Sequence, residues 1–207
     1  MILHGYRYSV YTRIARMVLA EKNLAYEYAE INPFAPDAPS SYLKFHPFQR
    51  VPALDHDGFI LYETTAISRY LDEAFPKPAL QPTDPRHCAR MNQIIAIIDA
   101  YAYWPMVRQV FSHRVFKPAS GLPHDEQQIE VGLIAANRAL AALEILIDPA
   151  SPLTLADLHL APMMAYFTAA PEGHAALTLH PKLTAWWGAI QRRACLKLTD
   201  PGLPGSS

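Results

Sequence analysis

Apolar and polar positions follow different patterns in the two halves of the chain. In the first half, the mostly apolar Met1–His4 and the alternating Leu24–Ile31 are typical of strands, and Tyr11–Lys22 has an apolar face at helical spacing. Three prolines in residues 32–41 predict an irregular loop, with a short helix up to Phe45. The chain is therefore expected to begin with a strand, a helix and a second strand.

A hairpin and a helix are expected next. Val51–Leu54 and Phe59–Tyr62 are apolar, and the turn residues Asp55–Gly58 between them favour a hairpin. Pro52 cannot donate to a sheet ladder and its peptide bond can be cis, so it indicates a strand start or a fixed turn. Glu63 then precedes a stretch with apolar residues at helical spacing. The order β-α-β-(α)-β-β-α resembles a thioredoxin-like domain.

Beyond a proline-rich segment, the apolar pattern is helical throughout. Four prolines between residues 76 and 85 predict a linker at residues 77–85, which separates a domain of residues 1–76 from an all-helical domain of residues 86–207. Pro105 is expected to kink the first long helix, and residues 196–207 are expected to form a loose tail. The clearest amphipathic helix is predicted by the spacing of Ile129, Leu133, Ala136, Leu140, Leu143 and Ile147.

Thr154 and Asp157 carry the pattern of a capping box at a helix start. The Thr154 hydroxyl can accept from the Asp157 N–H while the Asp157 carboxylate accepts from the Thr154 N–H, and Leu153 can pack on Leu158. We assign this pair to the structure of the helical domain and not to catalysis.

Composition and charge narrow the function classes. The chain has 207 residues, 51% of them hydrophobic, a net charge of −1 and a pI near 6.7, which argues against nucleic-acid or anionic-membrane binding. No apolar run is long enough to span a membrane, and we expect no signal peptide. The two cysteines favour free thiols in a reducing compartment, hence a cytoplasmic location. Nine scattered histidines without ligand spacing predict no metal site.

The helix start at Thr64 is the strongest local candidate for ligand binding. A helix N-terminus offers unpaired N–H groups and a partial positive charge, both of which suit a carboxylate. Thr64 adds a hydroxyl, and Glu63 can pair with an ammonium group. A ligand with an ammonium and a carboxylate on one carbon would match, although an ordinary capped helix explains the same residues.

Two separated motifs resemble the cytosolic glutathione S-transferase family. They are Val51-Pro52-Ala53-Leu54 followed by Glu63-Thr64, and Ser9-Val10-Tyr11-Thr12-Arg13, which is similar to the serine pattern of the phi-like and theta-like classes. The Thr154–Asp157 box matches a third family motif, so the resemblance covers nearly the whole chain. Two residues depart from the usual pattern, because Thr64 stands where serine is usual and Gln49 where glycine is common.

The resemblance assigns roles to these residues. It implies that the main chain of Val51, before a cis Pro52, pairs with the cysteinyl part of glutathione, and that Glu63 and Thr64 hold the γ-glutamyl end. Arg50 would contact the glycyl carboxylate, although a solvated arginine is an equal alternative.

Ser9 is the residue that the resemblance places against the glutathione sulfur. A donated hydrogen bond favours the thiolate and lowers the thiol pKa, and the thiolate is the nucleophile. Ser9 could instead only cap the first helix. Tyr6, Tyr8 and Tyr11 are rivals for the same role, because other classes of the family use tyrosine.

The expected activity is attack of a glutathione thiolate on a hydrophobic electrophile in a detoxifying homodimer. Glutathione is then a co-substrate, and Tyr103 and Trp104 are candidates for the electrophile pocket. One alternative is a glutathione-dependent isomerase, dehalogenase or peroxidase. Another is a non-catalytic module that binds glutathione or a partner.

Overall fold

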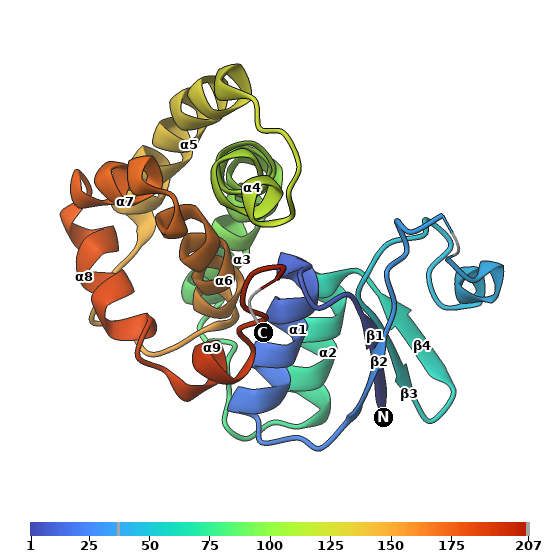
Figure 1. Cartoon of the computed structure of the whole chain (residues 1–207). Helices are drawn as coiled ribbons and strands as arrows, with labels where there is room; N and C mark the ends of the chain where they lie inside the picture. Colours follow the sequence, from blue (N-terminus) through green and yellow to red (C-terminus); the bar gives the residue numbers. More distant parts are fainter. Residues whose placement is uncertain (37, 206–207) are drawn as a thin grey trace. The chain divides into compact units, whose positions relative to one another are not determined.

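The chain forms two compact units, which we describe separately. A computed structural model describes residues 1–36 and 38–205 (Figure 1). The first unit comprises Met1–Gln81 and Leu198–Pro201, and the second comprises Pro82–Lys197 with residues 202–205. The first unit thus reaches beyond residue 76, where its end was predicted, and also takes in four residues from near the end of the chain. Residues 206–207 of the predicted helical domain lie outside the described residues.

The first unit has the predicted thioredoxin-like fold. Its strands are β1 (Ile2–Gly5), β2 (Glu27–Glu30), β3 (Ala53–His56) and β4 (Phe59–Tyr62), in the order β2-β1-β3-β4. Strand β1 is parallel to β2 and antiparallel to β3, and β3 is antiparallel to β4. The helices are α1 (Val10–Glu21), η1 (Ser40–Lys44) and α2 (Thr64–Ala74), and α1 and α2 lie side by side against the sheet (Figure 1).

The core of this unit lies between the two helices and the sheet. Apolar residues spaced along α1 and α2 meet the inward-facing residues of β1 and β3, as amphipathic elements require. Its fully buried members include Leu3, Ile14, Val18, Leu54, Ile67 and Leu71.

A buried ion pair explains why the first unit extends to Gln81. The ammonium of Lys22, at the end of α1, lies 2.7 Å from Asp72 Oδ1 on α2 and donates to the carbonyl of Pro78 at 2.7 Å. The two oxygens of Asp72 also accept from the backbone N–H groups of Leu80 and Gln81. Since both charged side chains are nearly inaccessible, these hydrogen bonds provide the polar partners that burial requires. Part of the predicted linker is therefore fixed to the first unit.

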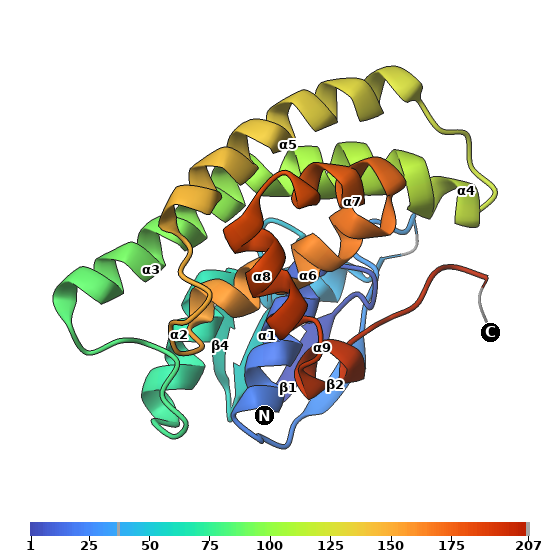
Figure 2. The same ribbon diagram turned by 90° about the vertical axis from the view of Figure 1, so that its left-hand side faces the viewer.

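The second unit is helical. It contains a long helical segment built from α3 (Pro85–Ile97), η2 (Ile98–Ala102), η3 (Trp104–Phe116) and α4 (Lys117–Ala119), followed by α5 (Glu126–Leu146), α6 (Leu155–Ala169), α7 (Pro171–Thr178), α8 (Pro181–Ile190) and the start of α9 (Ala194–Leu198). Helix α5 runs alongside the long segment (Figure 2). Among the residues described, no helix is both long and apolar enough to cross a membrane.

The long segment accommodates Pro105 by a change in winding. The N–H of Tyr103 donates to Ile98 O and that of Lys117 to Ser112 O, five residues back instead of four. These are π-helical hydrogen bonds, which are rare and mostly confined to single turns. The sequence predicted a kink at Pro105, and in the structure this proline lies within the π-helical stretch.

Asp157 links the start of α6 to α8. Its Oδ2 accepts from the Thr154 N–H at 2.7 Å, in a capping box at the helix start. Its Oδ1 accepts from the indole N–H of Trp186 at 2.8 Å. Helix α6 is buried on nearly all sides, so this single carboxylate both caps the start of the core helix and joins it to α8.

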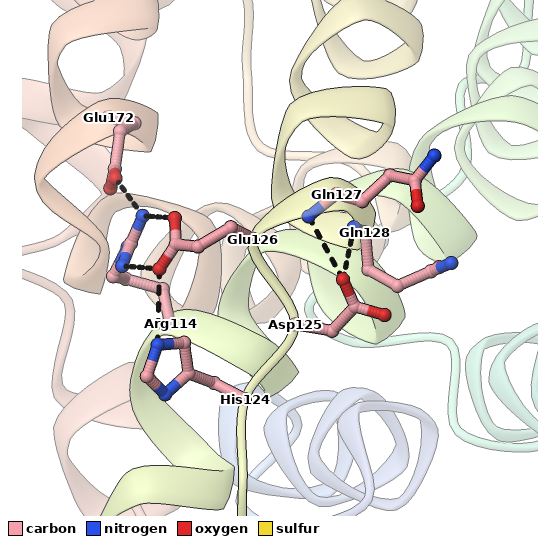
Figure 3. Close-up of polar contacts among 7 residues, drawn as sticks. All are labelled: Arg114, His124, Asp125, Glu126, Gln127, Gln128 and Glu172. Carbon is pink, nitrogen blue, oxygen red and sulfur yellow. Dashed lines mark hydrogen bonds and ion pairs between the residues drawn. The ribbon is translucent and has the colours of Figure 1, made fainter.

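Arg114 makes the main charged contact of the second unit (Figure 3). Its guanidinium binds both oxygens of Glu126, at 2.8 and 2.7 Å, and also Glu172 Oε1 at 2.7 Å, while His124 Nε2 lies 3.2 Å from Glu126 Oε1. Asp125 caps α5 beside this cluster. The cluster joins η3 to the starts of α5 and α7 through bidentate geometry, which is the favourable case for a partly exposed ion pair.

Burial of His159 should make the stability of the protein depend on pH. The side chain is 0% exposed in α6, and burial lowers the pKa of His159 to about 3 from an ordinary 6.5. The unfolded chain therefore binds this proton more readily, so the stabilisation is complete above pH 6.5 and is lost as the pH falls toward 3. We expect a loss of about 1.4 kcal/mol per pH unit below 6.5 from this residue.

Urea unfolding of the native protein and of His159→Gln between pH 7 and pH 4.5 measures this contribution. The variant should have the shallower dependence of unfolding free energy on pH. The exposed His174 offers a matched control for the histidine-to-glutamine change itself. Equal slopes for the native protein and His159→Gln would contradict the assignment.

Candidate active site

Three residues that pair side by side across the first unit's sheet are each close to a segment that connects a strand to the next element. We call these three connecting segments junctions. His4 on β1 lies opposite Ala53 on β3, and Ala53 lies opposite Tyr62 on β4. The chain after His4 leads to Ser9, the chain before Ala53 contains Val51, and the residue after Tyr62 is Glu63. Since antiparallel neighbours in one row have Cα atoms about 5 Å apart, the register brings all three junctions to one end of the sheet.

The first junction holds Ser9 at the start of α1. Ser9 is the N-cap residue, and its half-buried Oγ accepts from the Thr12 N–H at 3.3 Å. Thr12 in turn accepts from the Tyr6 N–H at 3.3 Å, and its side chain occupies the space where a Cβ on Gly5 would lie. Gly5 thus lets the first turn of α1 sit directly on the end of β1. The Ser9 hydroxyl keeps its proton for a further acceptor, because in the cap it only accepts.

Three tyrosines, Tyr6, Tyr8 and Tyr11, lie near this junction, and all are half-buried. Burial, and secondarily Tyr8, raises the pKa of Tyr6, so its hydroxyl stays protonated and can donate to an anion. The Tyr6 and Tyr8 rings meet edge to face at 5.5 Å, and Tyr11 lies half-buried on α1. Which hydroxyl activates a thiol stays a prediction, with Ser9 first because of its position in the resembled pattern.

The second junction contains the cis Val51–Pro52 peptide bond. Strand β3 was expected to begin at Val51, but pairing begins at Ala53, so Val51 lies outside the ladder with its side chain 8% exposed. The buried Tyr42 hydroxyl donates to the carbonyl of Arg50 at 2.8 Å and fixes the chain just before it. Arg50 itself is exposed, with its guanidinium 5.6 Å from the centre of the Phe34 ring.

Gln49 adopts a backbone conformation that favours glycine. Its φ is +53°, in the left-handed region where a Cβ meets the carbonyl oxygen. This conformation gives a physical reason for the glycine that is common at this position in the resembled pattern. Gln49 retains the turn at some cost in backbone energy.

The third junction places Glu63 in a strained conformation at the start of α2. Its φ and ψ are +71° and 117°, its side chain is exposed, and its carbonyl accepts from the Ile67 N–H at 2.9 Å. Residues in such sparsely populated regions cost about 1–3 kcal/mol and concentrate at ligand sites. Thr64, 6% exposed, is the first residue of α2, so its hydroxyl lies among the unpaired N–H groups of the helix start.

His46 joins the second and third junctions. Its ring is 2% exposed and lies 4.9 Å from the Tyr62 ring. Burial lowers the pKa of His46, the charge of Glu63 opposes this shift, and the charge of Arg50 adds to it. No sequence pattern predicts burial here, since the flanking residues are a proline and an aromatic in a loop.

Tyr103 and Trp104 belong to the second unit. Tyr103 is half-buried, and Trp104 is 58% exposed with the Arg108 guanidinium 6.0 Å from its ring centre. Their role as electrophile-binding residues stays a prediction. Within residues 1–36 and 38–205, no group of three or more His, Cys, Asp or Glu side chains is arranged to hold a metal ion.

Comparison with known proteins identifies the family. Residues 3–79 match the sequence profile of the glutathione S-transferase N-terminal domain. A maleylacetoacetate isomerase of Pseudomonas aeruginosa is 30% identical over 174 residues, which cover 79% of this chain and 80% of that protein. The chain belongs to the glutathione S-transferase family. Another relative, glutathione S-transferase F13 of Arabidopsis thaliana, is 29% identical over 98% of this chain and 96% of its own length.

Solved structures of the family share the fold of the whole chain. Glutathione S-transferase III in its apo form has a TM-score of 0.82 and 23% identity, and covers 98% of this chain and 96% of its own. Glutathione S-transferase I bound to lactoylglutathione has a TM-score of 0.81 and 22% identity, with 96% and 97% covered. At this identity the likeness establishes the transferase fold, namely the thioredoxin-like domain followed by the helical domain.

The contact between Gly5 and Thr12 should determine how Ser9 is presented. In Gly5→Ala the new methyl would collide with the Thr12 side chain, above all with its Cγ2, so we expect a loss of about 1–3 kcal/mol in unfolding free energy. Adding Thr12→Ser removes that methyl and keeps the hydroxyl, and should recover part of the loss. Urea unfolding measures both effects.

Gly188→Ala is the matched control, since nothing lies within 4 Å of the added methyl and alanine favours the helix α8. It should be neutral or slightly stabilising. If Gly5→Ala were as stable as this control, the close approach of α1 to β1 would be refuted.

Proposed function

We propose that the protein is a glutathione S-transferase that ionises the thiol of glutathione for attack on an electrophilic carbon. The observation that supports this most is the common row of His4, Ala53 and Tyr62. It gathers a hydroxyl at a helix start, a main-chain segment outside the ladder, and an acidic residue at a second helix start. The family membership and the glutathione S-transferases among the relatives agree with this activity.

Each part of glutathione has a chemically matched group at this end of the sheet. The exposed Glu63 carboxylate suits the γ-glutamyl ammonium, and the α2 N–H groups with the Thr64 hydroxyl suit the adjacent carboxylate. The N–H and C=O of Val51 can pair with the cysteinyl backbone in the manner of an added strand. Arg50 is proposed to bind the glycyl carboxylate, since an arginine pairs well with carboxylates.

The proposed mechanism needs few groups. The Ser9 hydroxyl donates to the sulfur, and the partial positive charge at the start of α1 lies beside it, so the thiolate is favoured over the thiol. The thiolate then forms a C–S bond to the electrophile. Either a leaving group departs with the electron pair of its bond, or a conjugated acceptor takes up a proton.

Several finer assignments belong to the same proposal. We place the protein with the serine-type, phi-like and theta-like members because of Ser9 and the residues that follow it. The electrophile is expected to be hydrophobic and bound by Tyr103 and Trp104. A cytoplasmic location, suggested by the two cysteines and the near-neutral charge, is proposed on the same basis.

A glutathione-dependent isomerase is the second candidate. It is favoured by the 30% identical relative named maleylacetoacetate isomerase. The two activities differ in their consumption of glutathione, because conjugation uses up one thiol per turnover and isomerisation regenerates it. Free thiol measured during turnover of halogenated aromatics and of cis-unsaturated diacids separates them.

The first test of the function uses the ultraviolet absorbance of the bound glutathione thiolate as a function of pH. In the native protein we expect the thiol pKa to lie well below that of a free thiol, about 8.5. In Ser9→Ala it should rise by at least about one unit, with conjugation at neutral pH reduced on the order of tenfold.

Glutathione affinity measured on the same samples is the control, since Ser9→Ala should change it little. Tight binding with no fall in thiol pKa would reject the transferase mechanism in favour of a binding module. A low pKa that survives Ser9→Ala would transfer the role from Ser9 to a neighbouring tyrosine or to the helix start.

We also propose a homodimer, to which the first unit would contribute exposed aromatic side chains. Phe48, in the loop before Val51, is 69% exposed and packs edge to face on His46 and Tyr62. Since symmetry would bury Phe48 twice, we expect Phe48→Ser to weaken dimerisation by a factor on the order of 10³. Sedimentation equilibrium should give twice the 23.2 kDa chain mass for the native protein, and a monomeric native protein would refute the dimer.

A further inference from the structure

The proposed activity leaves one buried cation near Ser9 without a role. Arg13 lies on α1, and its side chain is 2% exposed. Its backbone N–H donates to the Ser9 carbonyl at 3.0 Å, so the two residues are one helical turn apart. Residues four apart share a helix face, and long helical side chains lean toward the N-terminus, so Arg13 covers the turn that begins at Ser9.

The partner of Arg13 comes from the far end of the chain. Arg13 Nη2 lies 3.6 Å from Asp200 Oδ2, and Asp200 belongs to the segment Leu198–Pro201 that is compact with the first unit. The neighbouring Thr199 is 3% exposed, so this segment is packed and not loose. The expectation of a free tail from residue 196 onward is wrong for these residues.

The two charges of this pair differ in solvent access. The Arg13 side chain is 2% exposed and that of Asp200 is 60% exposed. Water screens the field of the exposed carboxylate more than that of the buried guanidinium, so the pair does not cancel at the start of α1. The guanidinium therefore contributes a positive potential there, in the same direction as the helix dipole.

We propose that Arg13 and Asp200 together set the fraction of glutathione that is thiolate at Ser9, with Arg13 increasing it and Asp200 limiting it. This inference rests on the proposed function. Arg13 acts through its field and does not touch the sulfur, so it is a positioning residue for charge. Cβ atoms one turn apart are about 5–6 Å apart, which puts guanidinium and sulfur on the order of 10 Å from each other.

That separation fixes the size of the effect. At an effective dielectric constant of about 20, one charge at about 10 Å changes a pKa by on the order of one unit. Removing Arg13 should therefore raise the thiol pKa by about one unit. Removing the exposed Asp200 charge should lower it by a few tenths of a unit.

Other ionisable groups at this end of the sheet also contribute to the field and stay constant in the comparison. They are Tyr6, Tyr8, the exposed Arg7–Glu30 pair at 3.7 Å, His46, Arg50 and Glu63. None of them is changed in the variants used here, so the differences report on Arg13 and Asp200.

The test is the pH titration of the bound thiolate in Arg13→Met, Arg13→Lys, Asp200→Asn and Asp200→Glu. We expect a higher thiol pKa in Arg13→Met, a lower one in Asp200→Asn, and values near native in the two charge-conserving variants. If the ion pair were merely structural, Arg13→Met and Asp200→Asn would shift the thiol pKa in the same direction, since the loss of either partner loosens α1. Glu73→Gln, an exposed carboxylate on α2, is the control for surface charge and should leave the pKa unchanged.

Shifts in the same direction, no shift in Asp200→Asn, or an equal rise in Arg13→Lys and Arg13→Met would overturn the inference. If Arg13→Met does not fold, Asp200→Asn and Arg13→Lys decide: a lower pKa in the first with a near-native value in the second supports it. A native protein that forms no thiolate would overturn the proposed function, and this inference with it. If the native protein forms a thiolate but its pKa is unchanged in Asp200→Asn, the inference is overturned and the proposed function is not.

Discussion

The register of the sheet is the constraint on which the candidate site depends. Strand β3 pairs with β1 and β4 through the same residue, Ala53, and this fixes where all three strands meet the loops. Successive residues along a strand are about 3.3 Å apart and point to opposite faces. A slip of one residue would therefore both separate the junctions and turn the buried Leu3 and Leu54 away from the helices. The packing of the core thus enforces the geometry of the site.

Local patterns predicted much of this arrangement. The hairpin, the helix starts at Ser9 and Thr64, and the Thr154–Asp157 pair all follow from the properties of residues close together in sequence, and the thioredoxin-like and helical architecture is confirmed. The convergence of Ser9, Val51 and Glu63 was inferred only through a family resemblance. Strand register arises from contacts between distant segments, which periodicity does not encode.

The features that the sequence did not predict also arise from contacts between segments that are distant in sequence. The composition around Val51 is typical of a strand, but strand pairing begins only at Ala53. Asp200 lies in the segment that was expected to be a loose tail, and it pairs with Arg13, which is far away along the chain. The backbone strain at Glu63 is set by the junction between β4 and α2, and no preference of glutamate would indicate it.

The two units use charge in different ways. The first holds its segments together with cations removed from water, Lys22 and Arg13, while the second relies on the partly exposed Arg114 cluster. Salt screens exposed charges far more than buried ones, so high ionic strength should weaken the Arg114 cluster, and the contribution of the exposed Asp200, more than the Lys22–Asp72 pair.

The pairing of Arg13 with Asp200 also constrains how the protein is made. During synthesis the first unit emerges from the ribosome long before residue 200 is translated, and domains generally fold as they appear. For that period the nascent unit carries a guanidinium whose carboxylate partner does not yet exist. The thioredoxin-like half can reach its final arrangement only when almost the entire polypeptide has left the exit tunnel.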